Sequence, residues 1–67
     1  MEVCMYRIEH PDGRIVTKHK RFERFYVKYP HFADDELERF ETESREEAEK
    51  ALEATNRNWD GFRIVEA

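Results

Sequence analysis

Apolar and polar side chains alternate near the start of the chain, which is the periodicity of a β-strand. In residues 2–9, Val3 and Met5 alternate with Cys4, Tyr6 and Ile8, so both faces of a strand there are partly apolar. Cys4 is expected to be a small core residue, because it lies among apolar neighbours.

The next four residues, His10–Gly13, are typical of a tight turn. Proline presets φ at the second turn position, and glycine accepts the positive φ that follows. We therefore expect a hairpin in which residues 14–20 pair antiparallel with the first strand.

Alternation continues from the second strand towards Tyr29. On an unbroken strand Phe25, Val27 and Tyr29 share one face and are expected to be core residues. Arg21 and Glu23 interrupt that face, and sixteen residues exceed the usual strand of about five or six. The sequence therefore predicts a bulge or bend near residues 20–23.

Residues 36–42 fit two structures. Leu37, Arg39 and Glu41 alternate with the residues between them, which favours a strand after Pro30 and a loop at 31–35. A helical turn is the alternative, because Ala33, Leu37 and Phe40 have helical spacing. We predict the strand, since Phe40 and Thr42 suit it and a helix start follows directly.

That helix start is the clearest local signal. Ser44 is an N-cap residue and Glu47 follows three positions later, which forms a capping box. An apolar stripe follows at helical spacing, and a helix with this stripe packs closely on a sheet: Ala48, Ala51, Leu52 and Thr55. The polar segment 56–61 ends the helix, and residues 62–66 predict a closing strand.

These elements predict one α+β domain over residues 1–67. Its architecture is a small two-layer antiparallel sheet with one helix packed on one face, in the order β-β-β-α-β. The other sheet face is expected to be uncovered.

Charge is segregated along the chain although the net charge is only −4. Residues 14–29 contain six basic residues and one acidic residue, whereas residues 34–53 contain ten acidic and three basic residues. The two regions can attract each other within the fold, attract each other across a dimer, or bind separate partners.

The basic segment suggests one candidate surface. Basic and aromatic residues alternate on the even positions of the second strand: Lys18, Lys20, Phe22, Arg24, Tyr26 and Lys28. Such a face suits single-stranded nucleic acid, with bases stacked on rings and phosphates near cations. A solvated or dimerising sheet face has the same composition, and the net negative charge favours that reading.

The acidic helix suggests a second surface. Glu46, Glu49 and Glu53 can dock a basic partner or mimic phosphates, although a solvated helix face has the same pattern. Trp59 follows the helix and is expected either to fold over the helix end and close the core or to form an exposed binding hot spot. We favour closure of the core.

No catalytic, cofactor or metal constellation is present in the sequence. Cys4 has no neighbouring base, the histidines His10, His19 and His31 share no ligand spacing with it, and the only glycines are Gly13 and Gly61. We therefore expect no enzyme activity and no cofactor.

The sequence also suggests where the chain acts. One cysteine fits a reducing compartment, and neither a signal peptide nor an apolar run of about 20 residues is present, so we expect a cytoplasmic protein without a membrane partner. So short a chain builds a small core, which makes a homodimer an open alternative.

The end of the chain carries a resemblance. Phe40–Leu52 reads F-x-T-x-S-x-E-E-A at its start and is followed by the closing segment Phe62–Glu66. It resembles short phage and bacterial α+β proteins in which a strand leads into such a helix and then a closing strand. The resemblance implies a small phage-type modulator or inhibitor that binds a host protein. We therefore expect a non-catalytic protein-interaction module, with nucleic-acid binding through the basic-aromatic strand as the alternative.

Overall fold

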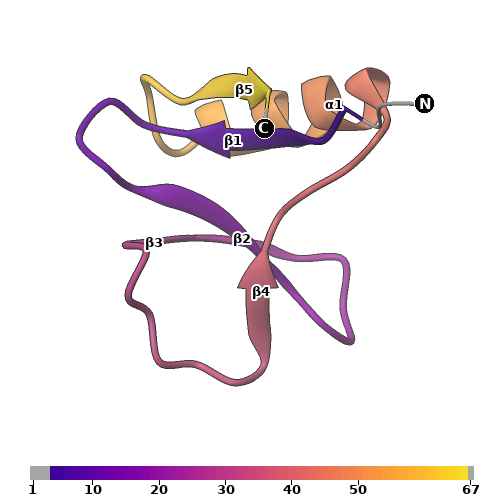
Figure 1. Ribbon diagram of the computed structural model, residues 1–67. Coiled ribbons are helices and arrows are strands. Elements are labelled where there is room, and N and C mark those ends of the chain that lie inside the picture. The colour runs from indigo at the N-terminus through magenta and orange to yellow at the C-terminus, as the bar shows by residue number, and fades with distance from the viewer. Residues whose placement is uncertain (1–3, 67) are drawn as a thin grey trace.

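The computed structural model describes residues 4–66, which form an antiparallel sheet with one helix packed on it (Figure 1). The order of elements along the chain is β1 (Tyr6–Glu9), β2 (Ile15–His19), β3 (Phe25–Lys28), β4 (Leu37–Arg39), α1 (Arg45–Asn56) and β5 (Arg63–Glu66). The predicted α+β class is confirmed. The sheet contains five strands within the described range, one more than the sequence pattern predicts.

The additional strand arises because the predicted long second strand folds back on itself. β2 and β3 pair antiparallel, with Val16 opposite Val27 and Thr17 opposite Tyr26. The chain reverses between them at residues 20–24, where the His19 N–H donates to the Arg24 carbonyl oxygen at 3.0 Å. The predicted bend near Arg21 is thus a complete reversal, which leaves the charged residues of this segment exposed in a turn.

The first hairpin forms at its predicted turn, but the predicted pairing of residues 14–20 with the first strand is wrong beyond Ile15, because β1 pairs along its length with β5. The Gly13 N–H donates to the His10 carbonyl oxygen at 2.9 Å, and Gly13 has φ 103°. The Arg14 backbone N–H and guanidinium both bind the Asp12 carboxylate and hold the pKa of Asp12 below its ordinary value. Beyond the turn, β1 and β2 pair only at Glu9 and Ile15.

Residues 37–42 lie between the opened arms of this hairpin. β4 pairs with β2, with His19 opposite Leu37, while Thr42 pairs with Tyr6 of β1. Figure 1 shows the chain rising from β4, past β2, to reach α1 beside β1 and β5. The prediction of a strand rather than a helical turn at 36–42 is confirmed for Leu37–Arg39.

The helix begins at the predicted cap. The Ser44 hydroxyl accepts the Glu47 N–H at 3.2 Å. The return half of the capping box runs through Thr42: the Ser44 N–H donates to the Thr42 hydroxyl, which donates to the Glu47 carboxylate at 3.0 Å. The cap therefore joins the strand segment to the helix as well as starting it.

The core lies between α1 and the sheet. Its buried residues come from β1, β2, the segment after β4, α1 and the position just before β5: Ile8, Val16, Phe40, Ala51 and Phe62. Val27, Leu52 and Ile64 pack against this cluster. The predicted helix stripe is confirmed, because Ala48, Ala51 and Thr55 are buried.

The sheet face opposite α1 is not bare, contrary to expectation. Ile15, Thr17, His19 and Leu37 are buried there, on the face that alternates with Val16 and Lys18. Figure 1 shows the 29–36 connection curving around this side before the chain enters β4. The connection formed by residues 29–36 thus covers part of the sheet face that the sequence pattern predicts to be uncovered.

Three burial predictions are wrong. Cys4 is exposed rather than part of the core, Phe25 is about one-third exposed, and Tyr29 is largely exposed. The reversal at 20–24 places Phe25 and Tyr29 on an edge strand and its continuation, where less of the chain covers them. Within the described range the first strand begins at Tyr6; residues 2–3 of the predicted strand lie outside that range.

Gly61 provides a test of this packing. Its φ is 92°, and a Cβ atom there would lie 2.7 Å from Nε2 of His10, whose ring packs against Phe62 at 5.1 Å. Gly13 also has positive φ, but a Cβ atom there meets nothing within 4 Å. We expect Gly13→Ala to cost about 1–3 kcal/mol from backbone strain, and Gly61→Ala to cost more, because the ring must also move.

Urea unfolding followed by circular dichroism measures this difference. Gly13→Ala is the matched control, since it carries the same backbone penalty without the contact to His10. Equal losses in the two variants would contradict the role assigned to the His10 contact.

Candidate interaction surface

β3 is an end of the sheet path, which runs β3-β2-β1-β5. Among the described residues, its backbone hydrogen-bonding groups therefore meet another strand on one side only. The bond from the His19 N–H to the Arg24 carbonyl fixes the phase of the antiparallel ladder. Because facing groups alternate, Tyr26 and Lys28 turn their backbone groups to β2, and Phe25 and Val27 turn theirs outward.

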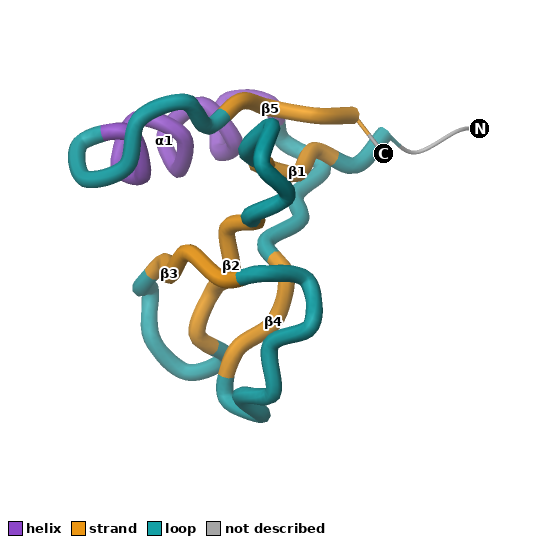
Figure 2. Tube along the Cα trace, turned by 90° about the vertical axis from the view of Figure 1, so that its left-hand side faces the viewer, coloured by secondary structure: helices purple, strands orange, loops and turns teal. Residues whose placement is uncertain are grey.

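Two hollows flank Phe25 between β3 and α1. The first, of about 200 Å³, is lined by residues from β3, from α1 and from the turn after it: Phe25, Tyr26, Val27, Ala54, Thr55, Asn58 and Trp59. The second, of about 400 Å³, has a charged lining of Lys18, Glu23, Glu47 and Lys50, together with Phe25 and Ala51. Figure 2 shows α1 and β3 on the same side of the molecule. We call the first hollow the β3–α1 groove.

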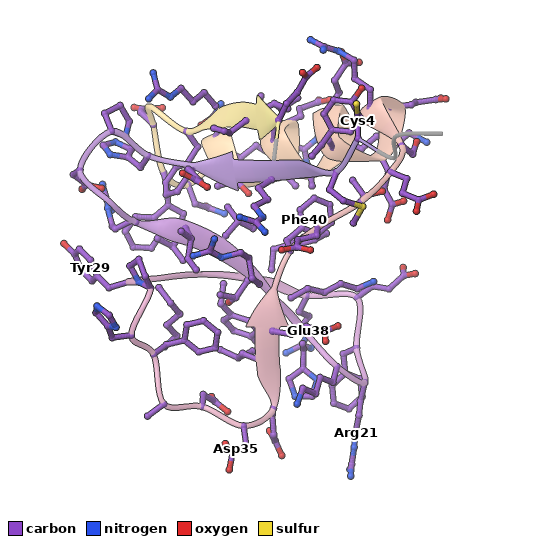
Figure 3. The ribbon with its side chains drawn as sticks, in the orientation of Figure 1. Cys4, Arg21, Tyr29, Asp35, Glu38 and Phe40 are labelled. Carbon is purple, nitrogen blue, oxygen red and sulfur yellow. The ribbon has the colours of Figure 1, made fainter. Side chains whose placement is uncertain are left out.

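Aromatic side chains are concentrated around this edge. Phe25 and Trp59 line the groove and are 36% and 49% exposed, whereas Tyr26, which is 37% exposed, borders the groove and directs its side chain to the opposite face of β3. Phe22 in the turn and Tyr29 after β3 are more exposed still. Figure 3 shows Arg21 and Tyr29 extending away from the molecule at opposite ends of the β3 region.

Trp59 is placed by the end of the helix. Its N–H donates to the Thr55 carbonyl oxygen at 2.9 Å, and the Arg14 guanidinium lies 5.9 Å from the centre of its ring. The prediction that Trp59 closes the core is wrong, because Phe62 takes that position and is 5% exposed. Trp59 instead forms one wall of the groove.

The predicted basic-aromatic face is divided by the β2–β3 reversal. Lys18 is opposite Phe25 and shares its face, whereas Tyr26 and Lys28 point to the opposite face. The remaining members of the set, Lys20, Phe22 and Arg24, lie in or next to the turn. The six residues therefore surround one hairpin but do not form the single flat face that was predicted.

The cations of the β2–β3 hairpin make no close ion pair with the described residues. Ion pairs hold Arg7, Arg14, Arg45 and Arg57 elsewhere in the fold. Within residues 4–66, by contrast, no ion pair joins another described residue to any of the five hairpin cations: Lys18, Lys20, Arg21, Arg24 and Lys28. The only acidic residue in residues 14–29 is Glu23.

The predicted acidic surface lies on the exposed side of α1. Glu46, Glu49 and Glu53 are all exposed. Arg45 pairs with Glu49 at 3.4 Å, and Arg57 pairs with Glu53 at 3.5 Å. Exposed pairs of this kind contribute about 0.3–0.5 kcal/mol each. Two of the three carboxylates thus already have a partner, and they lie on the helix face away from the core.

Two histidine side chains accept a hydrogen bond from the backbone N–H two residues later. Nδ1 of His19 accepts the Arg21 N–H at 3.0 Å, and its Nε2 lies 3.2 Å from the Glu36 carboxylate. His10 Nδ1 accepts the Asp12 N–H at 3.1 Å. In the part of the chain that the structure describes, no group of three or more His, Cys, Asp or Glu residues is arranged to hold a metal ion.

Part of the groove cannot be predicted from the sequence. Strand alternation predicts Phe25 as a core residue, and the sequence carries no binding signal at Ala54, Thr55 or Asn58. An exposed alanine beside the helix stripe carries no signal of its own. Only the position of β3 relative to α1 makes these residues neighbours.

Over residues 4–66, no helix has the length and apolar character needed to cross a membrane. Comparisons with protein-family models, with curated proteins and with solved structures found no match.

Proposed function

We propose that the chain is a non-catalytic protein-interaction module that binds its partner along β3 and the β3–α1 groove. The observation that carries this proposal is the coincidence of an unpaired strand edge with three half-exposed aromatic residues, Phe25, Tyr26 and Trp59. Proteins normally blunt such edges, and aromatic residues that line a pocket are the usual anchors of an interface. The host-protein binding that the resemblance implies would use this surface.

The other end of the sheet path lacks these features. β5 carries Arg63 and Glu66 at its two ends, and charged residues protect an edge strand from pairing. β3 has the sequence FYVK, with a single charge at its end. The two edges therefore differ in aromatic content, because β3 carries Phe25 and Tyr26 whereas β5 carries no aromatic residue.

Affinity capture from a bacterial lysate tests the proposal. Tagged wild-type protein is compared with Trp59→Ala, a groove variant, and Tyr29→Ala, an exposed aromatic outside the groove. After nuclease treatment, we expect recovery of a specific protein to fall at least about tenfold for Trp59→Ala, as for a hot-spot residue, and to be little changed for Tyr29→Ala. Thermal unfolding of each variant checks that the fold is retained.

Either of two outcomes would contradict the proposal. One is a captured protein whose recovery is the same for wild type and Trp59→Ala. The other is loss of every captured protein on nuclease treatment.

Nucleic-acid binding is the second candidate, favoured by one observation. Phe22 is 60% exposed in a turn whose cations form no ion pair with the described residues, so ring stacking and phosphate contacts are available together. A fluorescent fifteen-residue oligothymidine measures it. If this candidate holds, affinity decreases steeply with salt and is lost in the Lys18/Lys20/Arg24 triple alanine variant. Unchanged affinity in that variant rules it out.

A further inference from the structure

We infer that the partner contributes an extended acidic segment, which pairs with β3 as an added strand and places one apolar side chain in the β3–α1 groove. This inference rests on the proposed protein-binding function and specifies the chemistry of the partner. Three features of the described residues carry it: the outward backbone groups of β3, the charge around them, and the size of the groove.

The backbone of β3 offers a template for one more strand. Phe25 and Val27 turn their N–H and C=O groups away from β2, and among residues 4–66 no strand pairs with β3 on that side. An extended segment satisfies these groups through main-chain hydrogen bonds at every second residue, which is how peptides add to sheet edges. A helical partner has no free backbone groups for this ladder.

The positively charged residues around β3 favour an acidic partner segment. Arg24 and Lys28 bracket β3, and Lys20 and Arg21 lie in the turn that leads into it. These cations form no ion pair with the described residues, and Arg24 and Lys28 are exposed, so their charges are available to a partner along the edge. Acidic side chains on an added strand would lie opposite or diagonal to Arg24 and Lys28, where opposite charges stabilise a strand pair.

The same charges disfavour a second copy of this chain in the register that overlaps β3 fully. If two β3 strands paired antiparallel about Tyr26, Arg24 of one copy would lie opposite Lys28 of the other. Like charges directly opposite each other destabilise a strand pair. The edge is therefore better suited to an acidic partner than to self-association.

The groove fits a single side chain. Its volume of about 200 Å³ exceeds that of an apolar cavity of ~150 Å³ that holds benzene in an engineered protein. It is smaller than the ~300–1,000 Å³ of most small-molecule sites. Its walls include Phe25, Val27 and Trp59, and alternate side chains of a strand beside β3 point towards α1.

Selection from a displayed library of random twelve-residue peptides tests the inference. The folded chain is the target, and enriched peptides are synthesised and titrated by fluorescence anisotropy. We expect them to be acidic, with apolar residues at alternate positions. Methylating the backbone nitrogens one at a time should weaken binding about tenfold at every second position, as expected for lost hydrogen bonds, and leave the positions between them little changed.

A charge-swap variant tests the electrostatic part. Arg24→Glu/Lys28→Glu should weaken the acidic peptides at least about tenfold, and a peptide with lysine in place of its acidic residues should regain affinity for the variant. Arg63→Glu, an exposed change on the opposite edge strand, is the control and should leave binding unchanged.

The outcomes separate this inference from the function on which it rests. If the peptides require Trp59 but are not acidic, or show no alternation under methylation, the inference is wrong and the protein-binding proposal stands. If sedimentation at the same protein concentration shows a dimer that Arg24→Glu/Lys28→Glu abolishes, β3 is a self-association edge and the inference also fails. If no peptide is enriched while the oligothymidine binds, both are wrong.

Discussion

Replacing Phe40 with alanine is expected to unfold most of the protein at 37 °C. Phe40 is 3% exposed, lies in the core cluster between α1 and the sheet, and meets the Phe25 ring edge-on at 5.3 Å. Figure 3 shows it between the layer that contains β1 and the strands below. Truncation of a buried phenylalanine costs about 3–5 kcal/mol.

That loss is comparable to the whole stability of so small a domain. At roughly 0.05–0.15 kcal/mol per residue, a chain of 67 residues has a free energy of unfolding of about 3–10 kcal/mol. The position of Phe40 adds to the effect. Its backbone N–H donates to the Val16 carbonyl at 3.0 Å, where the chain leaves β4 and crosses towards β1. A cavity at this position would remove packing between the segment 37–42 and the two strands of the first hairpin, β1 and β2, that it lies between.

Thermal and urea unfolding followed by circular dichroism measure this prediction. Phe22→Ala is the matched control, because Phe22 is 60% exposed and should change stability by no more than about 0.5 kcal/mol. Similar losses in the two variants would show that Phe40 does not hold the layers together.

Ala51→Leu is expected to destabilise the fold by about 1–3 kcal/mol through overpacking. Ala51 is 2% exposed and belongs to the core cluster, where its small side chain lets α1 lie close to the sheet. Leucine adds three carbon atoms in this space, and the helix or its neighbours must move to accept them. Helix propensity does not offset the loss, because alanine and leucine have similar preferences for helix interiors.

Ala54→Leu is the control for this change, since it places the same side chain three residues later on an exposed part of the same helix. We expect its midpoint of urea unfolding to stay near that of the wild type. Because Ala54 lines the β3–α1 groove, this variant should also weaken a partner that fills the groove while the fold is intact. Equal destabilisation by the two leucine variants would contradict the close approach of α1 at Ala51.

Local chemistry determined the features that the sequence predicted correctly. The turn at His10–Gly13 requires only a proline at its second position and a glycine two residues later, and the helix start requires only a hydroxyl and a backbone N–H three residues apart. The helix stripe of Ala48, Ala51 and Thr55 follows from the helical repeat. The turn, the helix cap and the helix stripe each depend on residues that are close in the sequence, within about two helical turns or a single reversal of the chain.

Tertiary structure decided which of the predicted faces are buried. The same alternation of residues 14–29 fits one long strand or two paired strands, and only the reversal at residues 20–24 assigns Lys18 and Tyr26 to opposite faces. The exposure of Phe25 follows from the position of β3 at the end of the sheet path. The sequence around a phenylalanine in a strand does not show whether another segment of the chain will cover that side chain.

The candidate site shows the same division. By itself the sequence determined that cations and aromatic residues are concentrated in residues 14–29 and that Trp59 follows the helix. The structure determined that β3 forms a groove with α1 and that Trp59 is one of its walls rather than a lid on the core. The physical reason is the distance along the sequence over which each feature is determined. Turns and caps form through hydrogen bonds between residues that are close in sequence. Burial depends on segments that are distant in the chain and meet only when the whole domain packs.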